Sequence, residues 1–494
     1  MKSSVLVKTG GIYLGLSVVS NLINLFLTPI YTNNLTITEY GSYSIITSYQ
    51  SLFSIFITLG IFSGMKRFFN EYEDKNRLKN IALTFSLFWG ALVFVLGMIF
   101  AQGLAGIIFP SEVQGTEYLR YVVINSILSC IISIYTAYYS MQYKAMKASF
   151  IELSKLILTL VFTLIFVVAY DEGIIGILKS QCFSYAIVPV ILIIVDIKRI
   201  RFELGKDELK EMLTYGVGIV GASDILDWVL TLIDRYFLKI ILGYATVAVY
   251  SIGYKVGMLI MPFFIVPFRN MLTPYKYSIY MEDDGKKKLE ELFDYYCIIG
   301  WFIVLGISIY ANLAIQVLAT DEYAQAFKIV PIIVIAYLLE GSCEFFSLGI
   351  HIEKKVALNL AVPGVAAAMN MALNLVLIPQ IGSYGAAIAT IISYFAMALM
   401  YHYAGRIYYR MDINVLRLLR AGIPFVTIYG IYMYCGIYGL GPLEESALNL
   451  LLCVAYLAIS VTFGFIPKSR MAILAGFVRA RLAKRRADDE GKDL

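Results

Sequence analysis

A row of charged side chains interrupts an apolar stretch that is long enough to cross a bilayer, Met212–Leu242. The charges are Asp224, Asp227, Asp234, Arg235 and Lys239. At about 100° per residue they share one face of a helix. A charge at mid-membrane costs roughly 2.5–3.5 kcal/mol, so we expect this face to contact other helices or water rather than lipid.

Further charges fall inside apolar runs, and their depth follows from a helical rise of about 1.5 Å per residue. Lys255 and Glu340 come out near mid-depth, and Glu344 lies one turn further along. One interpretation is a structural ion pair between Asp227 and Lys255.

In the functional hypothesis, the charged residues form two sets with different roles. Positive potential for an anionic headgroup comes from Lys255, Arg235, Lys179 and Lys155, although Lys155 and Lys179 could also snorkel. The candidates for proton or sodium coupling are Asp224, Asp227, Asp234, Glu340 and Glu344.

Amide side chains add polar faces to two predicted helices. Asn21 and Asn24 lie on a polar seam of the first apolar run, Gly10–Tyr31, and Asn370 and Asn374 are spaced i and i+4 further along. Such amides could bind the headgroup or its sugars, or they could join neighbouring helices through hydrogen bonds.

Composition places the chain among polytopic, all-α membrane proteins. Hydrophobic residues make up 60% of it, charged residues 15%, and the mean hydropathy is +0.75. The six cysteines form no CxxC pair and the two histidines lie near predicted helix ends. We therefore expect no disulfide, no metal site, no catalytic residue and no cofactor.

Fourteen apolar runs are each long enough to span the membrane. With the amino terminus in the cytoplasm, the outer loops carry only Arg120 and Lys328, as the positive-inside rule requires. Both termini are then cytoplasmic, in the cytoplasmic (inner) membrane. We interpret the basic tail as a solvated end near anionic lipids and expect no nucleic-acid binding.

Two sequence matches indicate an internal repeat. Tyr43-Ser44-Ile45 recurs as Tyr250-Ser251-Ile252, and Gly173-x-x-Gly176 recurs as Gly382-x-x-Gly385 at nearly the same spacing. They predict two six-helix lobes related by a pseudo-two-fold along the membrane normal, plus two further helices. The predicted divisions are a first lobe at 1–197, a cytoplasmic linker at 198–212, a second lobe at 213–410, the extra helices at 411–467 and the tail at 468–494.

With these features the whole chain resembles the polysaccharide transporter (oligosaccharidyl-lipid flippase) branch of the multidrug, oligosaccharidyl-lipid and polysaccharide exporter superfamily. The residues that carry the resemblance are Glu39–Tyr43, Leu59-Gly60, Trp228, Asp234–Leu238, Val249–Lys255 and Gly382–Ala389.

The resemblance implies a flippase. Its substrate would be a polyprenyl-pyrophosphate-linked oligosaccharide, moved from the inner to the outer leaflet by alternating access for O-antigen, capsule or exopolysaccharide assembly. The expected partners are that glycan lipid, membrane lipids and polysaccharide assembly proteins. We expect coupling to a proton or sodium gradient.

Three alternatives are kept. Lipid II flippases carry basic residues in the first helix, where this chain has Asn21 and Asn24. Drug exporters of the superfamily usually stop at twelve helices. A membrane-embedded polysaccharide polymerase or glycosyltransferase would usually need a large outer loop or an acidic metal-binding motif, and the sequence has neither.

Overall fold

The computed structural model describes residues 3–110, 112–434 and 441–462, and within them every regular element is a helix. The predicted all-α fold is confirmed. Ten helices of this part of the chain are long and apolar enough to cross a membrane, or up to thirteen if each of three bent pairs counts as one span. The 32-residue helix α1 is not among them. The number fourteen stays a prediction, and the tail at 468–494 lies outside the described residues.

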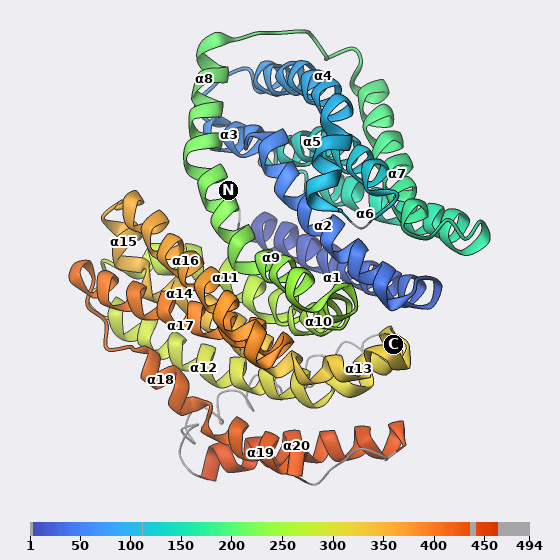
Figure 1. Cartoon of the computed structure of the whole chain (residues 1–494). Coiled ribbons are helices and arrows are strands. Elements are labelled where there is room, and N and C mark those ends of the chain that lie inside the picture. Colours follow the sequence, from blue (N-terminus) through green and yellow to red (C-terminus); the bar gives the residue numbers. More distant parts are fainter. Residues whose placement is uncertain (1–2, 111, 435–440, 463–494) are drawn as a thin grey trace, which may run out of the picture.

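The first lobe contains seven α-helices and one π-helical turn (Figure 1). They are α1 (Ser3–Asn34), α2 (Ile37–Thr58), α3 (Ile61–Phe68), α4 (Lys75–Ile108), α5 (Gly115–Met141), α6 (Ala145–Thr163), η1 (Leu164–Ala169) and α7 (Gly173–Asp196). Local sequence sets several of these boundaries. Thr36 and Glu39 form a reciprocal capping box at the start of α2, and Asp74 caps α4 by accepting from the backbone of Asn76 and Arg77.

The second lobe begins with the helix that crosses from the first. Its elements are α8 (Lys206–Tyr215), η2 (Gly216–Gly221), α9 (Ala222–Leu242), α10 (Tyr244–Gly257), η3 (Met261–Ile265), α11 (Val266–Ile279), α12 (Gly285–Ile309), α13 (Ala311–Leu318), η4 (Asp321–Lys328), α14 (Val330–Phe346), α15 (Leu348–Ile352), α16 (Val356–Ile381) and α17 (Ser383–Tyr408). The buried helix α14 is its centre.

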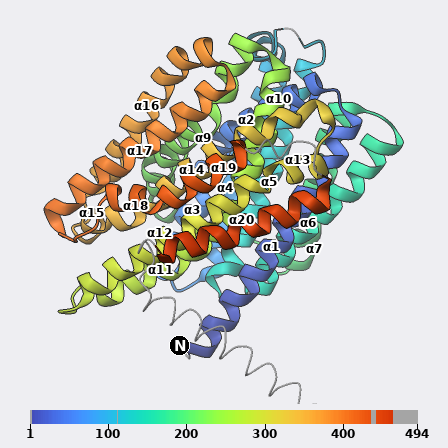
Figure 2. The ribbon, with the colours of Figure 1, turned by 90° about the horizontal axis from the view of Figure 1, so that it is seen from below.

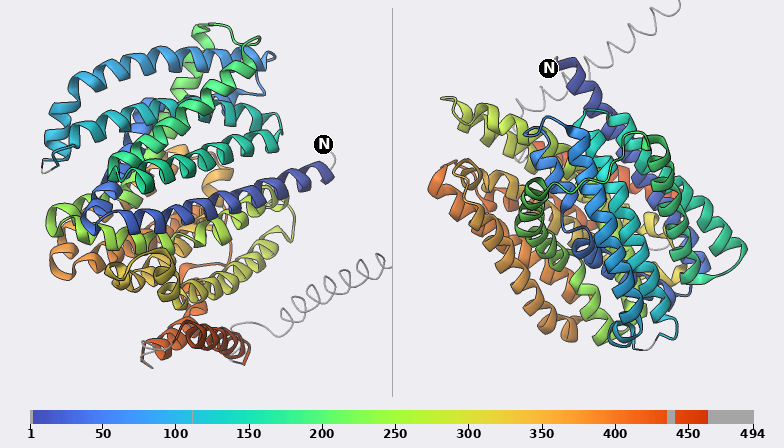
Figure 3. Two further views of the ribbon diagram at one scale, coloured as in Figure 1. Left: turned by 90° about the vertical axis from the view of Figure 1, so that its right-hand side faces the viewer. Right: turned by 90° about the horizontal axis from the view of Figure 1, so that it is seen from above.

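The remaining helices are α18 (Val415–Ala421), α19 (Ile423–Tyr434) and α20 (Pro442–Thr462), and α19 and α20 pack along α12 (Figure 2). Viewed from the side, the long helices of both lobes run in roughly the same direction, as expected for membrane-spanning bundles (Figure 3). We call the end of the molecule where α1 begins the inner side and the end where α1 finishes the outer side.

The glycine pairs of the predicted repeat occupy matching positions. A Cβ atom on Gly176 would lie 2.9 Å from the carbonyl oxygen of Phe166, at the end of the preceding helical segment. A Cβ atom on Gly385 would lie 2.5 Å from the carbonyl oxygen of Leu377, near the end of α16. In both lobes a glycine thus lets a helix pack closely on the one before it.

The linker predicted at 198–212 is shorter than expected, because the chain is helical from Lys206 onward. α8, η2 and α9 form one 37-residue membrane-crossing helix. Asp207 and Glu208 in its first turn complement the helix dipole, and Met212 is fully buried against Gly64 of α3. The helix therefore begins within the region predicted as linker. Apolar periodicity does not reveal the contact between Met212 and Gly64.

The inner half of this crossing helix is fixed to the first lobe. The Tyr72 hydroxyl, in the loop before α4, donates to Glu211 of α8 at 2.6 Å. This hydrogen bond, aided by desolvation, raises the pKa of Tyr72 to about 12. Gly60 lies between α2 and α3 and has a φ of 62°. Its backbone packs directly against that of Gly216.

We predict that Gly60→Ala destabilises the protein. A Cβ atom at this positive-φ position would be strained and would lie 2.6 Å from the carbonyl oxygen of Gly216. Strain and overlap of this kind cost about 1–3 kcal/mol. Thermal unfolding in detergent should therefore show a melting temperature several degrees below that of the parent.

The matched control is Gly103→Ala, because a Cβ atom at Gly103 would have no neighbour within 4 Å. This exposed helical change should leave the melting temperature unchanged or slightly raised. Equal melting temperatures for both variants would show that the contact between Gly60 and Gly216 is dispensable.

Candidate functional site

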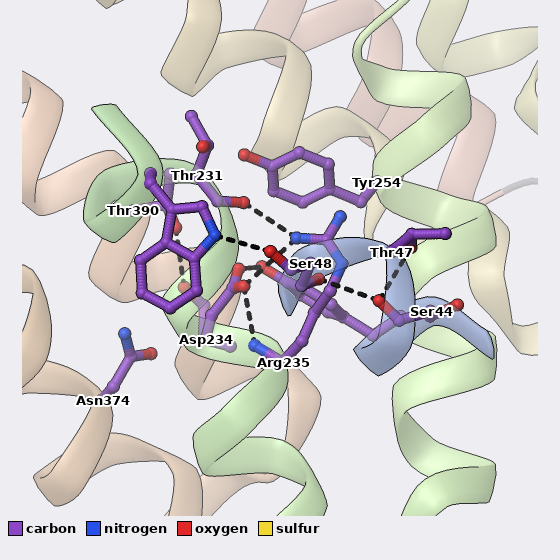
Figure 4. A network of polar contacts seen from close by, with 12 residues as sticks. Ser44, Thr47, Ser48, Thr231, Asp234, Arg235, Tyr254, Asn374 and Thr390 are labelled. Atoms are coloured by element: carbon purple, nitrogen blue, oxygen red, sulfur yellow. Dashed lines mark hydrogen bonds and ion pairs between the residues drawn. The ribbon is translucent and has the colours of Figure 1, made fainter. Parts of the chain in front are cut away.

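Arg235 is a buried cation on α9 whose surroundings satisfy only part of its hydrogen-bonding capacity. It is 7% exposed, and its Nη1 atom donates to the carbonyl oxygen of Thr231 at 2.8 Å (Figure 4). The guanidinium carbon lies 4.6 Å from the ring centroid of Tyr254, a cation–π contact. A guanidinium has five N–H donors, so several are left for another ligand.

Asp234 contacts Arg235 and is itself buried. Its side chain is 2% exposed and accepts from the Tyr250 hydroxyl and from the backbone N–H of Arg235, the latter at 2.8 Å. The Nη1 atom of Arg235 is 3.4 Å from the same carboxylate. Asp234 therefore compensates the charge of Arg235 and orients it.

Lys255 is the second cation, and it reaches from α10 across to α1. Its Nζ atom donates to the Thr28 hydroxyl and, at 3.2 Å, to the carbonyl oxygen of Asn24. The suggested ion pair between Asp227 and Lys255 is not present among the described residues. Asp227 is instead exposed.

Both cations line a cavity of about 570 Å³ between the lobes. The second-lobe wall includes Arg235, Ser251, Tyr254 and Lys255 on α9 and α10. The first-lobe wall consists of α1 and α2 side chains, mostly polar: Asn21, Asn24, Tyr40, Tyr43, Ser44, Thr47, Ser48 and Ser51. No carboxylate is among the residues that line this cavity, so its wall has a net positive charge.

The cavity is closed toward the outer side, where the lobes touch. Gly41 of α2 lies against the backbone of Tyr244 so closely that no Cβ atom would fit. The Thr32 hydroxyl donates to the carbonyl oxygen of Leu318 at 3.1 Å. The rings of Tyr40 and Tyr323 pack edge to face with centroids 5.7 Å apart. We call these three contacts the outer gate.

Toward the inner side the lining becomes accessible. Asn24, Ser51 and Met258 line the cavity and are exposed. Asp224 is partly exposed and Asp227 exposed, nearer the inner end of α9. Neither aspartate takes part in an ion pair among the described residues.

Two predicted headgroup lysines lie outside the cavity lining, each in its own ion pair. Lys179 on α7 pairs with Glu172 at 2.7 Å, and Lys155 on α6 pairs with Glu152 at 2.5 Å. The structure therefore brings Lys255 and Arg235 together but leaves Lys155 and Lys179 apart from them.

Asn370 and Asn374 lie within the second lobe rather than in the cavity. Both are fully buried on α16, and the Asn374 amide nitrogen donates to the Asn370 side-chain oxygen at 2.9 Å. In Figure 4, Asn374 lies on the opposite side of Asp234 from Ser44 and Ser48. The hydrogen bond between them lies within α16, so the interhelical role that the sequence left open stays a prediction.

Glu340 and Glu344 on α14 have cationic partners on α11. Arg269 contacts Glu340 at 2.6 Å, and Lys276 contacts Glu344 at 2.8 Å. Both cations lie on α11, which continues to Ile279. The two cations are seven residues apart and the two carboxylates are four residues apart, so each pair lies on one face of its helix. This spacing is a sequence signal that could have indicated the pairing.

A second cavity, of about 620 Å³, lies between α11 and α12. Its charged lining residues are Lys288 and Glu291, and Lys288 already pairs with Glu282 and Asp284. It lacks the two facing cations of the inter-lobe cavity, which is therefore the stronger candidate site.

Comparison with known proteins gives a family and a fold. A family model described as "Polysaccharide biosynthesis protein" matches residues 34–328. The uncharacterized membrane protein MJ1068 of Methanocaldococcus jannaschii is 22% identical over 410 residues, covering 74% of this chain and 77% of that protein.

Two solved structures have the same fold. The lipid II flippase MurJ, in an inward closed conformation, matches with a TM-score of 0.70 at 11% identity, over 90% of this chain and 98% of MurJ. An inward-facing multidrug resistance MATE family transporter of the MOP superfamily matches with a TM-score of 0.63 at 15% identity, over 83% of this chain and 98% of that one. MOP denotes the exporter superfamily named above.

We predict that enlarging Gly41 forces the outer gate open. Any side chain there would collide with the backbone of Tyr244, and the lobes can relieve this overlap by separating. A reporter cysteine at the cavity-lining position, Ser44→Cys, should be protected from a membrane-impermeant maleimide applied at the outer side. Adding Gly41→Leu should increase its labelling several-fold.

Gly103→Leu on exposed α4 is the control and should leave the labelling of Ser44→Cys unchanged. If Gly41→Leu also leaves it unchanged in a folded protein, the contact between Gly41 and Tyr244 does not close the cavity.

Proposed function

The chain belongs to the polysaccharide biosynthesis protein family, and we propose that it is a flippase for a polyprenyl-diphosphate-linked oligosaccharide. The family and the shared fold make it a multi-pass membrane transporter rather than an enzyme. The nature of its cargo, the direction of transport and the energy source are parts of the proposal.

The observation that carries the proposal is the cationic cavity between the lobes. Arg235 and Lys255 face a space of about 570 Å³ whose lining includes no carboxylate. A diphosphate that links a lipid to a sugar is anionic, and N–H donors bind such oxygens through charge-assisted hydrogen bonds. The remaining hydroxyl and amide groups suit a hydrated glycan.

The same cavity argues against one of the alternatives, a drug exporter. A cationic drug would meet the ammonium group of Lys255 and would find no carboxylate among the lining residues to bind it. A lipid II headgroup also carries a diphosphate, so the cavity alone does not separate the two lipids. Membership of a polysaccharide family favours the polysaccharide lipid over lipid II.

The geometry suggests how translocation would proceed. A glycan headgroup enters the cavity from the inner side, where Asn24, Ser51 and Met258 are exposed. Closing the inner side and separating the outer gate would then expose it on the other face, as in alternating access. We propose that the inner side is cytoplasmic, that both termini lie there, and that the membrane is the cytoplasmic (inner) one. Polysaccharide assembly proteins would receive the product.

Ion coupling is part of this proposal, and the structure narrows its candidates. Glu340 and Glu344 are already neutralised by Arg269 and Lys276, and Asp234 is held by Tyr250 and Arg235. Asp224 and Asp227 form no ion pair in the described part of the chain. A carboxylate without a fixed partner can exchange a proton or a sodium ion, so these two are the preferred coupling residues.

We predict that Lys255→Ala and Arg235→Ala each reduce translocation about 10- to 100-fold, since a hydrogen bond to a charged group contributes roughly 1.5–3 kcal/mol. The measurement is the amount of lipid-linked glycan in the inner leaflet of cells that carry each variant, identified by mass spectrometry. Substrate should accumulate there.

The control is Lys179→Ala, which removes a membrane lysine paired with Glu172 outside the cavity. It should change glycan translocation less than twofold, because surface ion pairs contribute about 0–1 kcal/mol. Normal translocation by folded Lys255→Ala and Arg235→Ala variants would contradict an anionic headgroup in this cavity.

We further predict that Asp227→Asn lowers gradient-driven translocation about tenfold while leaving the melting temperature nearly unchanged, because Asp227 is exposed and lacks a salt bridge among the described residues. Glu340→Gln should instead lower the melting temperature by several degrees, because it leaves the partly buried Arg269 without one of its partners. Liposomes with an imposed proton or sodium gradient provide the rates, and equal rates with and without the gradient in the parent would exclude coupling.

A further inference from the structure

The first-lobe wall of the cavity has a regular row of hydroxyl groups on α2. Ser44, Thr47, Ser48 and Ser51 recur every three or four residues and all line the cavity. We call them the hydroxyl row. Over the seven residues from Ser44 to Ser51, a rise of about 1.5 Å per residue gives a length of roughly 10 Å along the membrane normal.

Each hydroxyl of the row donates its hydrogen to the backbone of its own helix. Ser44 donates to the carbonyl oxygen of Tyr40 at 2.9 Å, and Ser48 donates to that of Ser44 at 2.8 Å. Thr47 and Ser51 make the corresponding bonds at 3.0 and 3.1 Å. A hydroxyl whose single hydrogen is committed in this way offers only its lone pairs to a ligand.

The hydroxyl row therefore presents hydrogen-bond acceptors to the cavity. The facing wall presents donors, because the guanidinium of Arg235 and the ammonium of Lys255 have no acceptor atoms. The walls also come from different lobes, with the row on α2 and the cations on α9 and α10. In Figure 4, Ser48 lies beside Arg235, and Ser44 and Thr47 lie on the same helix as Ser48.

These walls suit different parts of a glycan lipid. Oxygens of an ionised diphosphate are acceptors without hydrogens, so they would be repelled by lone pairs of the row and attracted by the cations. Sugar hydroxyls can donate, and their hydrogens match the lone pairs. Each part of the headgroup thus has one complementary wall.

We infer that the hydroxyl row of the first lobe is the glycan-binding subsite and that Arg235 and Lys255 form the diphosphate subsite. This assignment rests on the proposed function and adds to it the orientation of the headgroup and the residues that recognise the sugars. Each lobe holds a different part of the cargo. Separation of the lobes at the outer gate would therefore draw the two subsites apart and weaken binding at the moment of release.

The test compares two probes with one purified protein in lipid nanodiscs. The first probe is the lipid-linked oligosaccharide extracted from cells lacking this protein, and the second is the same lipid trimmed enzymatically to its first sugar. Binding is measured by native mass spectrometry. The row variant is Ser44→Ala, Thr47→Val and Ser51→Ala together, with the isosteric Thr47→Val alone as a second variant in case the triple variant does not fold.

We predict that the row variant binds the full oligosaccharide about tenfold more weakly and the trimmed lipid within about twofold of the parent, because several neutral hydrogen bonds to sugars are lost. Thr47→Val alone should show the same preference with a two- to threefold effect. Lys255→Ala should weaken the binding of both probes equally. The matched control is Ser129→Ala with Ser133→Ala on α5, since these hydroxyls make the same kind of bond to their own helix and do not line the cavity.

The assignment of the glycan subsite would be overturned if the row variant weakened the binding of both probes equally, or if it weakened the binding of neither. Those results leave the proposed function intact, because Lys255→Ala tests the diphosphate separately. If Lys255→Ala changes neither probe, or if neither probe binds the parent, the proposed function itself is wrong.

Discussion

The cost of burying cations in a bilayer is the constraint on which this structure depends. Arg235 and Lys255 lie well inside the membrane-spanning bundle, where lipid offers no hydrogen-bond acceptor. The protein supplies the missing solvation: a carboxylate and a backbone carbonyl for Arg235, and a hydroxyl and a backbone carbonyl from α1 for Lys255. This solvation is incomplete, and donors are left facing a polar cavity. An incompletely satisfied cation in a low-dielectric surrounding is a strong binding site for an anion.

The long helix formed by α8, η2 and α9 connects this electrostatic site to the movement of the lobes. Its inner half is fixed to α3 through Gly64 and through the contact between Gly60 and Gly216, whereas its outer half packs on α16. The same helix carries Arg235 and the aspartates nearer the inner side. A rearrangement between the lobes therefore changes the surroundings of the cation and of the exposed carboxylates together. In the proposed mechanism, this helix links ion binding to substrate release.

In the proposed assignment, a donor wall and an acceptor wall recognise the headgroup without a rigid glycan pocket. Hydroxyls bonded to their own helix cost little to desolvate and still accept bonds from sugars in several orientations. A cationic wall, in contrast, fixes the part that all such lipids share. In the proposed function, the cations supply a strong contact to the diphosphate and the hydroxyl row supplies weaker, adaptable contacts to the sugars.

The sequence by itself determined the all-α membrane fold, because hydropathy and length are local properties of each span. It also identified Arg235, Lys255, Asn21 and Asn24 as candidates for a headgroup site, and the structure places all four around one cavity. Only tertiary structure decided the partners. Lys255 reaches α1 rather than Asp227. Lys155 and Lys179 pair within their own lobe, and Glu340 and Glu344 pair with Arg269 and Lys276. Each of these outcomes depends on which helix faces are brought together across the bundle. Apolar periodicity specifies that a face must be buried, but it does not specify which neighbour covers it.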